Sequence, residues 1–193
     1  MIDAAGLPGI AALALGLLLF AVALVAVRWR RQPEAGGTRD AVSMIGIAVQ
    51  GSGFVIVASG GARVTLDPLG TAALAAAAIT AALMTGALAL FVWSTATMGR
   101  NWSLVARTRA DHRLVTGGPF AWVRHPIYTA LALVVVAMAL ATGHGRRLPL
   151  ALAVYAIGTW LRVRIEERLL HAKFGAAYRD HAARVKRFVP GLF

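Results

Sequence analysis

Three apolar runs in the N-terminal half of the chain are each close to the length of a helix that crosses a lipid bilayer, which needs about 20 residues. They read "GLPGIAALALGLLLFAVALVAV" (Gly6 to Val27), "AVSMIGIAVQGSGFVIVAS" (Ala41 to Ser59) and "TAALAAAAITAALMTGALALFVW" (Thr71 to Trp93). Hydrophobic residues make up 59% of the 193 residues, above the roughly 45–50% typical of soluble domains. These runs predict an integral membrane protein.

Two shorter apolar runs follow, from Pro126 to Thr142 and from Leu148 to Leu161, joined by "GHGRR", which we expect to be a tight turn. Runs this short can cross a locally thinned bilayer, or they can form a partly inserted hairpin shielded by other helices. We therefore predict an all-α, polytopic integral membrane protein with about five transmembrane helices, and the depth of the hairpin stays open.

Basic residues gather on the connections that five alternating helices place on one side of the membrane. Because positive residues are enriched in cytoplasmic loops, the N-terminus is expected outside and the C-terminus in the cytoplasm. The stretch "FGAAYRDHAARVKRFVPGLF" is amphipathic, and we expect it to lie along the cytoplasmic face. The residues that support this orientation follow the first, third and fifth runs: Arg28, Arg30, Arg31, Arg39; Arg100, Arg107, Arg109, Arg113, Arg124; and eight Lys/Arg after Leu161.

Charge and cysteine content exclude several functions. The formal net charge is +12, but membrane topology and anionic headgroups account for it, and no nucleic-acid-binding module is recognisable, so no nucleic-acid partner is expected. The chain has no cysteine, which excludes disulfides and thiolate chemistry. No metal site is expected, because no two histidines are spaced i,i+4 and no HExxH is present.

Titratable residues form three clusters on the expected cytoplasmic side, where their cost near a membrane suggests a site. The clusters are "HRLVTGGPF", "VRHPIY" and "WLRVRIEERLLHAKFGAAY". Ordinary interpretations remain open: Arg124 and His125 can reach lipid headgroups, and Arg162 and Glu166 can form an i,i+4 ion pair. We expect Glu167 to lie on a solvated helix face, together with Arg164 and Arg168.

The three clusters together resemble the isoprenylcysteine carboxyl methyltransferase family, to which phospholipid methyltransferases are related. The resemblance rests on "LVTGGPFAWVRHPIYTA" and, about forty residues later, "RIEERLLHAKFGAAYRDHAARVKRFVP". It covers roughly Gly99 to Pro190. It implies an integral membrane enzyme that binds S-adenosylmethionine on its cytoplasmic side and methylates a lipophilic acceptor, most simply the carboxylate of an isoprenylcysteine-like substrate.

The resemblance also implies roles for particular residues. Arg162 matches the family's substrate-side arginine and is the candidate catalytic residue. Two departures from the family pattern are Phe120, where tyrosine is frequent, and Ala130, where glycine is common. The residues implied for the cofactor pocket are His112, Leu114, Val115, Phe120, His125, Pro126, Ile127, Tyr128 and Glu166.

These residue types suit the implied chemistry. A carboxylate such as Glu166 can bind the ammonium or ribose hydroxyls of S-adenosylmethionine, and aromatic faces such as Phe120 and Tyr128 suit adenine or the cationic sulfur. Methyl transfer depends mainly on positioning. A carboxylate acceptor is ionised at neutral pH, so it needs no general base, and Arg162 can bind it with two hydrogen bonds. Arg124 would anchor the helix that begins at Pro126 to the headgroups.

The expected organisation is an N-terminal three-helix membrane region, 1–93, that shapes the entrance for lipid, and a C-terminal cofactor-binding region, 94–193. Alternatives stay open. A phospholipid amine or small thiol as acceptor would require a base, with His125 or Glu167 as candidates. An NADPH-dependent sterol-type reductase shares an RHP-like block but typically reads RHPNYFGE, where this chain has "RHPIYTAL". A non-catalytic membrane subunit leaves the motif combination unexplained. The oligomeric state is not indicated.

Overall fold

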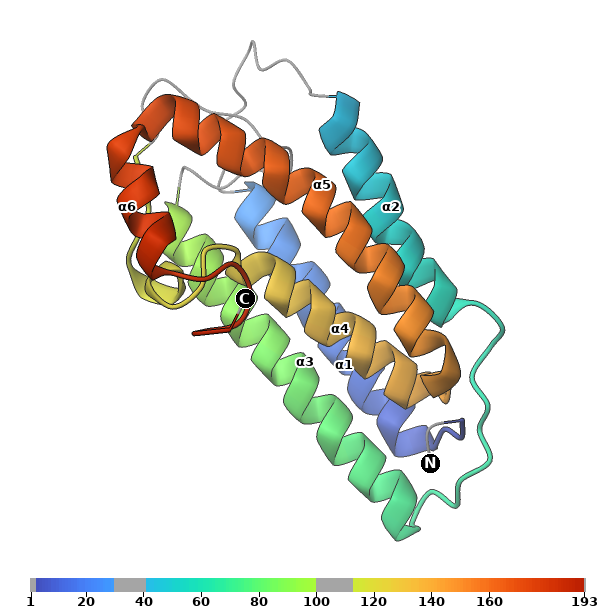
Figure 1. Ribbon diagram of the computed structural model, residues 1–193. Coiled ribbons are helices and arrows are strands. Elements are labelled where there is room, and N and C mark those ends of the chain that lie inside the picture. The colour runs from blue at the N-terminus through green and yellow to red at the C-terminus, as the bar shows by residue number, and fades with distance from the viewer. Residues whose placement is uncertain (1–2, 30–40, 100–112, 193) are drawn as a thin grey trace.

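The computed structural model describes residues 3–29, 41–99 and 113–192, which form a bundle of helices (Figure 1). The five apolar runs each become a helix, so the all-α class and the five apolar helices are confirmed. The main helices are α1 (Leu7–Trp29), α2 (Ala41–Ala58), α3 (Thr71–Met98), α4 (Pro126–Thr142), α5 (Leu148–Phe174) and α6 (Ala176–Arg184). Two short 3-10 helices, η2 (Gly118–Ala121) and η3 (Gly145–Arg147), precede α4 and α5.

Three helical segments in the described part of the chain are long and apolar enough to cross a membrane: Leu7–Trp29, Thr71–Met98 and Gly145–Phe174. The segments Val42–Ala58 and Pro126–Thr142 are apolar but shorter. The fifth helix is longer than its apolar run because α5 continues through the charged sequence after Leu161 as far as Phe174. The charged residues of the third sequence cluster are therefore carried on a rigid extension of a membrane helix.

The helices pack in two groups that share α4. Helix α3 packs along α1 and α4, and α2 packs along α5, while α4 also contacts α2 and α5 (Figure 1). Helices α1 and α3 end, α4 begins and α5 ends at one end of the bundle, which we call the basic end. The proposed division after residue 93 falls inside α3, and it stays a prediction.

Glycines bring α2 and α5 unusually close together. A Cβ added to Gly158 would lie 2.3 Å from the backbone nitrogen of Gln50, and one added to Gly53 would lie 2.8 Å from the carbonyl oxygen of Ala151. Small residues permit such close backbone approach between membrane helices. Gln50 and Gly53, which interrupt the second apolar run, thus lie on the face of α2 that meets α5.

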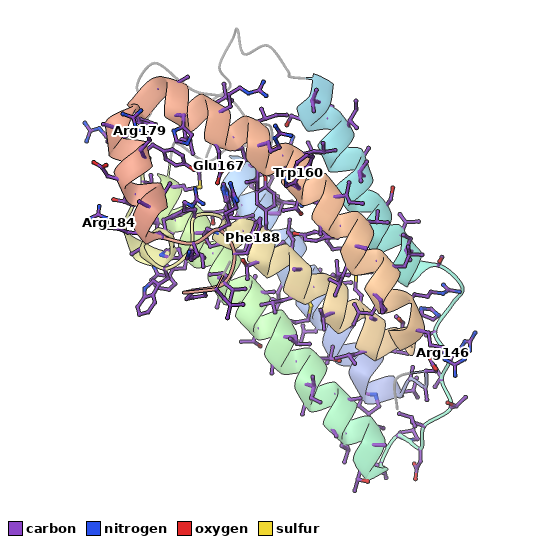
Figure 2. All side chains as sticks on the ribbon, viewed as in Figure 1. Arg146, Trp160, Glu167, Arg179, Arg184 and Phe188 are labelled. Atoms are coloured by element: carbon purple, nitrogen blue, oxygen red, sulfur yellow. The ribbon has the colours of Figure 1, made fainter. Side chains whose placement is uncertain are left out.

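The tight turn expected at "GHGRR" is confirmed, and it joins α4 to α5. Gly143 ends α4 in the left-handed conformation (φ 70°, ψ 32°), which glycine adopts without a Cβ penalty. The ring of His144 is buried, and its Nδ1 lies 2.8 Å from the carbonyl oxygen of Val57 at the end of α2. Arg146 pairs with Asp3 at this end of the bundle, opposite the basic end (Figure 2).

The amphipathic C-terminal stretch is folded differently from a single surface helix. Helix α6 has only 9 residues and ends at Arg184, after which the chain runs back to the start of α4 (Figure 1). Val123 and Lys186 form an isolated parallel β-bridge there. Tyr178 of α6 is 2% exposed. Contacts with α4 and α5 therefore hold this segment against the bundle.

Candidate active site

The start of α4 is held by the C-terminal tail, residues 185–192. Pro126 occupies the first turn of α4, where its fixed φ suits a helix and its missing N–H is not needed. The backbone N–H of Arg124 donates to the carbonyl of Lys186 (2.8 Å), and that of His125 donates to the carbonyl of Arg187 (2.9 Å). The tail therefore fixes the backbone from which the "RHP" motif presents its side chains.

Glu166 lies on α5 beside the first turn of α4. The Tyr128 hydroxyl donates a hydrogen bond to Glu166 Oε1, and His125 Nδ1 lies 3.6 Å from Glu166 Oε2. Tyr128 and His125 are buried, whereas the Glu166 side chain keeps 24% of its surface exposed. A carboxylate that is oriented through one oxygen and still partly exposed can accept further hydrogen bonds from a bound cation or hydroxyl.

Glu167 lies in a second, more enclosed group, which we call the ion-pair cluster (Arg124, His125, Glu167, Tyr178 and Arg187). Arg187 contacts the Glu167 carboxylate with both Nε (3.0 Å) and Nη2 (2.7 Å). Arg124 Nη1 lies 2.9 Å from Glu167 Oε1 and 3.4 Å from the Tyr178 hydroxyl, to which it donates. His125 Nε2 lies 3.3 Å from Glu167 Oε1. The cluster therefore ties α4, α5, α6 and the tail together.

Two sequence-based interpretations are wrong at this cluster. Glu167 is buried and ion-paired rather than solvated, because its side of α5 is covered by the returning tail. Arg124 has only 11% of its side chain exposed and pairs with Glu167, so it does not anchor α4 to lipid headgroups. Arg164 and Arg168 are exposed, as expected.

The charges of the cluster shift the pKa values of the groups on α6 and the tail. The hydrogen bonds to Glu167 raise the pKa of Arg187. Burial, and then the negative charge of Glu167, raise the pKa of Tyr178 to about 12. Tyr178 is therefore a neutral phenol at physiological pH. Its hydroxyl accepts the hydrogen bond from Arg124.

Arg162 lies one turn before Glu166 on α5, and it is 6% exposed. Its Nη1 donates to the side-chain oxygen of Gln50 on α2 (2.9 Å), and its guanidinium carbon lies 5.0 Å from the centre of the Tyr128 ring. Tyr128 therefore contacts both members of the predicted site, with its ring toward Arg162 and its hydroxyl toward Glu166.

The other residues implied for the cofactor pocket lie in several places. Phe120 is buried in η2, and Leu114 and Val115 are half-buried in the segment before it. Pro126 is buried at the start of α4. Ile127 packs against Phe91 and Ala130, on the side of α4 that meets α1 and α3. His112 lies outside the described residues. The structure thus brings together His125, Tyr128, Glu166 and Arg162.

Sequence reasoning missed three residues of this region: Gln50, Tyr178 and Arg187. Gln50 was visible as a polar residue within an apolar run, and a buried polar group in a membrane helix usually faces a partner. Tyr178 ends the "FGAAY" stretch of the resemblance, but no role was assigned to it. Arg187 carried no comparable signal, because it looks like an ordinary member of an amphipathic segment. Their place depends on the tail returning to α4, which is a tertiary contact.

An apolar helical bundle with a histidine, a tyrosine, a carboxylate and a guanidinium gathered toward one end defines an integral membrane protein with a candidate active site near its basic end. Comparison with known proteins identifies the family of this membrane protein. The chain belongs to the phospholipid methyltransferase family, whose model matches residues 75–177, more than half of the chain.

A more particular similarity is to the protein-S-isoprenylcysteine O-methyltransferase of Tribolium castaneum. The two are 32% identical over 85 residues, which cover 42% of this chain and 29% of that protein. This match confirms the resemblance that the "RHPIY" and "EE" motifs indicated. Residues 75–177 include His125, Tyr128, Arg162, Glu166 and Glu167, while Gln50 and Arg187 lie outside them.

Proposed function

We propose that this chain transfers a methyl group from S-adenosylmethionine to the carboxylate of a lipophilic, isoprenylcysteine-like acceptor. The observation that carries the proposal is the position of Glu166, a partly exposed carboxylate that accepts a hydrogen bond from Tyr128 and lies beside His125, next to the buried guanidinium of Arg162. A site for a cationic cofactor and a site for an anionic acceptor would then adjoin each other.

The residues present fit S-adenosylmethionine. Glu166 can accept hydrogen bonds from its ammonium group or its ribose hydroxyls, and Phe120 and Tyr128 offer aromatic faces for adenine or the sulfonium. His112, Leu114, Val115, His125, Pro126 and Ile127 complete the proposed binding set. When bound, the cofactor supplies an electrophilic methyl group. The chain's own contribution is to position the acceptor and to keep water away from it.

The contacts of the two candidate bases support a carboxylate acceptor over an amine or a thiol. An amine or thiol must lose a proton, and a general base must reach it. Glu167 is engaged by Arg124 and Arg187, and the two nitrogens of His125 face Glu167 and Glu166. A carboxylate acceptor needs no base, and Arg162 provides the positive charge that would hold it.

Calorimetric binding of S-adenosylhomocysteine to detergent-purified protein tests the cofactor, with NADPH as control ligand. Glu166→Gln should weaken binding by about 10- to 100-fold, the effect of losing a charge-assisted hydrogen bond. Arg162→Ala should keep near-normal affinity but impair transfer from methyl-labelled S-adenosylmethionine. Binding of NADPH instead would indicate a reductase, and binding of neither ligand by folded protein would indicate a non-catalytic subunit. Equal loss of affinity in both variants would contradict their separate roles.

A panel of acceptors tests the substrate class. Methyl transfer to an S-prenylated cysteine is expected, with no transfer to its carboxamide or to phosphatidylethanolamine. Preferred methylation of the amine lipid or of a small thiol would reject the carboxylate acceptor while retaining the methyltransferase.

We also propose that the basic end faces the cytoplasm, on the distribution of arginine and lysine. The chain has no cysteine, so single cysteines can report the orientation without any background. Arg179→Cys, at an exposed position of α6, should resist a membrane-impermeant maleimide in intact cells, whereas Leu69→Cys, at the opposite end, should react. The reverse pattern would place the site outside the cell.

A further inference from the structure

Gln50 is a buried polar residue of α2 whose two side-chain groups both contact α5. Its oxygen accepts a hydrogen bond from Arg162 Nη1 (2.9 Å), and its nitrogen donates to the hydroxyl of Thr159 (2.8 Å). Gln50 is 4% exposed and Thr159 is also buried. Because both ends of the amide are engaged, its orientation is fixed rather than free to rotate.

The backbone around Gln50 is also fixed, by the close approach of α2 and α5. The position of a Cβ on Gly158 lies 2.3 Å from the Gln50 backbone nitrogen, and that of a Cβ on Gly46 lies 2.6 Å from Arg162 Cγ. The glycines thus let α2 reach the backbone of α5 and the aliphatic stem of Arg162. The amide of Gln50 and the guanidinium of Arg162 are therefore held at a defined separation.

Contacts continue from Arg162 toward the proposed cofactor site. Its guanidinium lies over the ring of Tyr128, and the hydroxyl of Tyr128 donates to Glu166. Gln50, Arg162, Tyr128 and Glu166 thus form a connected series that runs from α2 through α5 and α4. A displacement of the Gln50 amide would first change the position of the Arg162 guanidinium.

The chemical character of Gln50 matters as much as its position. A neutral amide orients a guanidinium without cancelling its positive charge, whereas a carboxylate at the same place would neutralise it. In a membrane-embedded region of low dielectric constant, that difference would be large for an anionic ligand. A glutamine here therefore orients Arg162 without adding a negative charge beside it.

We propose that Gln50 is a positioning residue that holds Arg162 ready for the anionic head group of the acceptor, so that α2 helps to select acid over neutral lipophilic substrates. This deepens the proposed function of Arg162 and rests on it. It also assigns a role in substrate choice to a helix outside the residues that match the methyltransferase family.

The test measures binding selectivity rather than turnover. N-acetyl-S-farnesylcysteine and its carboxamide are titrated into detergent-purified protein by calorimetry, with and without S-adenosylhomocysteine. Wild type should bind the acid about tenfold or more tightly than the amide, as expected for a charge-assisted contact. Gln50→Glu, which keeps the size and the contact with Arg162, should bring that ratio close to one. Gln50→Leu should weaken acid binding more than amide binding.

Ser52→Ala is the matched control on the same helix, because Ser52 is exposed and its hydroxyl donates to the carbonyl of Ala48 within α2. It should retain the wild-type ratio. Wild-type selectivity in Gln50→Glu, or equal weakening of acid and amide, would overturn the proposal, and so would a wild type that does not distinguish the two ligands. Failure of the proposed function looks different: folded wild type would not bind S-adenosylhomocysteine, whether or not acid selectivity is present.

Discussion

Glu166 and Glu167 are neighbours on α5, but their surroundings differ. Glu167 is in the ion-pair cluster, where Arg124 and Arg187 contact its carboxylate. Glu166 is contacted by a tyrosine hydroxyl and a histidine ring and keeps 24% of its side-chain surface exposed. Successive residues of an α-helix point about 100° apart, so one helix presents one carboxylate to the tail and the other to the Arg162 side. The carboxylate of Glu167 is therefore structural, whereas that of Glu166 is available to a ligand.

The largest expected effect comes from Glu167→Gln. Removing this charge leaves Arg124, whose side chain is only 11% exposed, without its carboxylate, and breaking a largely buried pair costs about 3–5 kcal/mol of stability. Thermal unfolding in detergent should show a midpoint lowered by several degrees. The matched variant is Glu166→Gln, which should unfold close to wild type while binding S-adenosylhomocysteine more weakly. Equal stability losses in the two variants would contradict the contrast between these residues.

The next effect concerns the packing of α2 against α5. This packing places Gln50 beside Arg162, on the side of α5 that carries Glu166. Gly158→Ala places a Cβ 2.3 Å from the backbone of Gln50, and overpacking of this kind costs about 1–3 kcal/mol. Gly51→Ala is the control, because its Cβ would meet nothing within 4 Å and alanine is the better helix former. Unfolding midpoints should fall for the first and hold or rise for the second. An unchanged unfolding midpoint in Gly158→Ala would show that α2 and α5 can move apart at little cost in stability.

Much of this fold could be predicted from the sequence, because membrane helices are encoded locally. Length and apolar content located all five helices, and "GHGRR" located the turn between the last two. The same patterns could not locate the tail. Its amphipathic sequence fits a surface helix, and only the pairing of Arg187 with Glu167 and its backbone bonds to residues 124 and 125 bring it back to α4. Such contacts depend on residues about 20 and 60 positions away.

The candidate site was predictable where the motif and local chemistry agree. Tyr128 and Glu166 were both named from the motifs, and the structure places them in direct contact. Glu167 was misjudged because helical spacing alone does not indicate which face is covered. Gln50 was not named as a site residue, because nothing in the sequence indicates that α2 packs on α5 rather than on α1.

A smaller effect should follow from Tyr128→Phe, which tests whether the orientation of Glu166 matters for binding. The change removes the hydroxyl that donates to Glu166 but keeps the ring beside Arg162. A hydrogen bond to a charged group contributes about 1.5–3 kcal/mol. Because Glu166 can recover part of this by hydration, we expect about tenfold weaker binding of S-adenosylhomocysteine by calorimetry. Tyr155→Phe, which removes a hydroxyl bonded to the Tyr128 carbonyl, is the control and should leave cofactor affinity unchanged. Unaltered affinity in Tyr128→Phe would mean that Glu166 does not depend on this contact.

The smallest effect is a pH dependence at the edge of the ion-pair cluster. Burial, and then the positive charges of Arg124 and Arg184, lower the pKa of His181 below its usual value of 6.5. Since the unfolded chain then binds a proton more readily than the folded protein, this residue's contribution to stability is lost as the pH falls below about 6.5. His181→Gln should flatten the fall in unfolding midpoint between neutral and mildly acidic pH, measured against wild type in the same detergent. His171→Gln is the control, because His171 is exposed, and it should keep the wild-type slope. If instead His181→Gln follows the wild-type curve, the acid sensitivity of this end arises from groups other than His181.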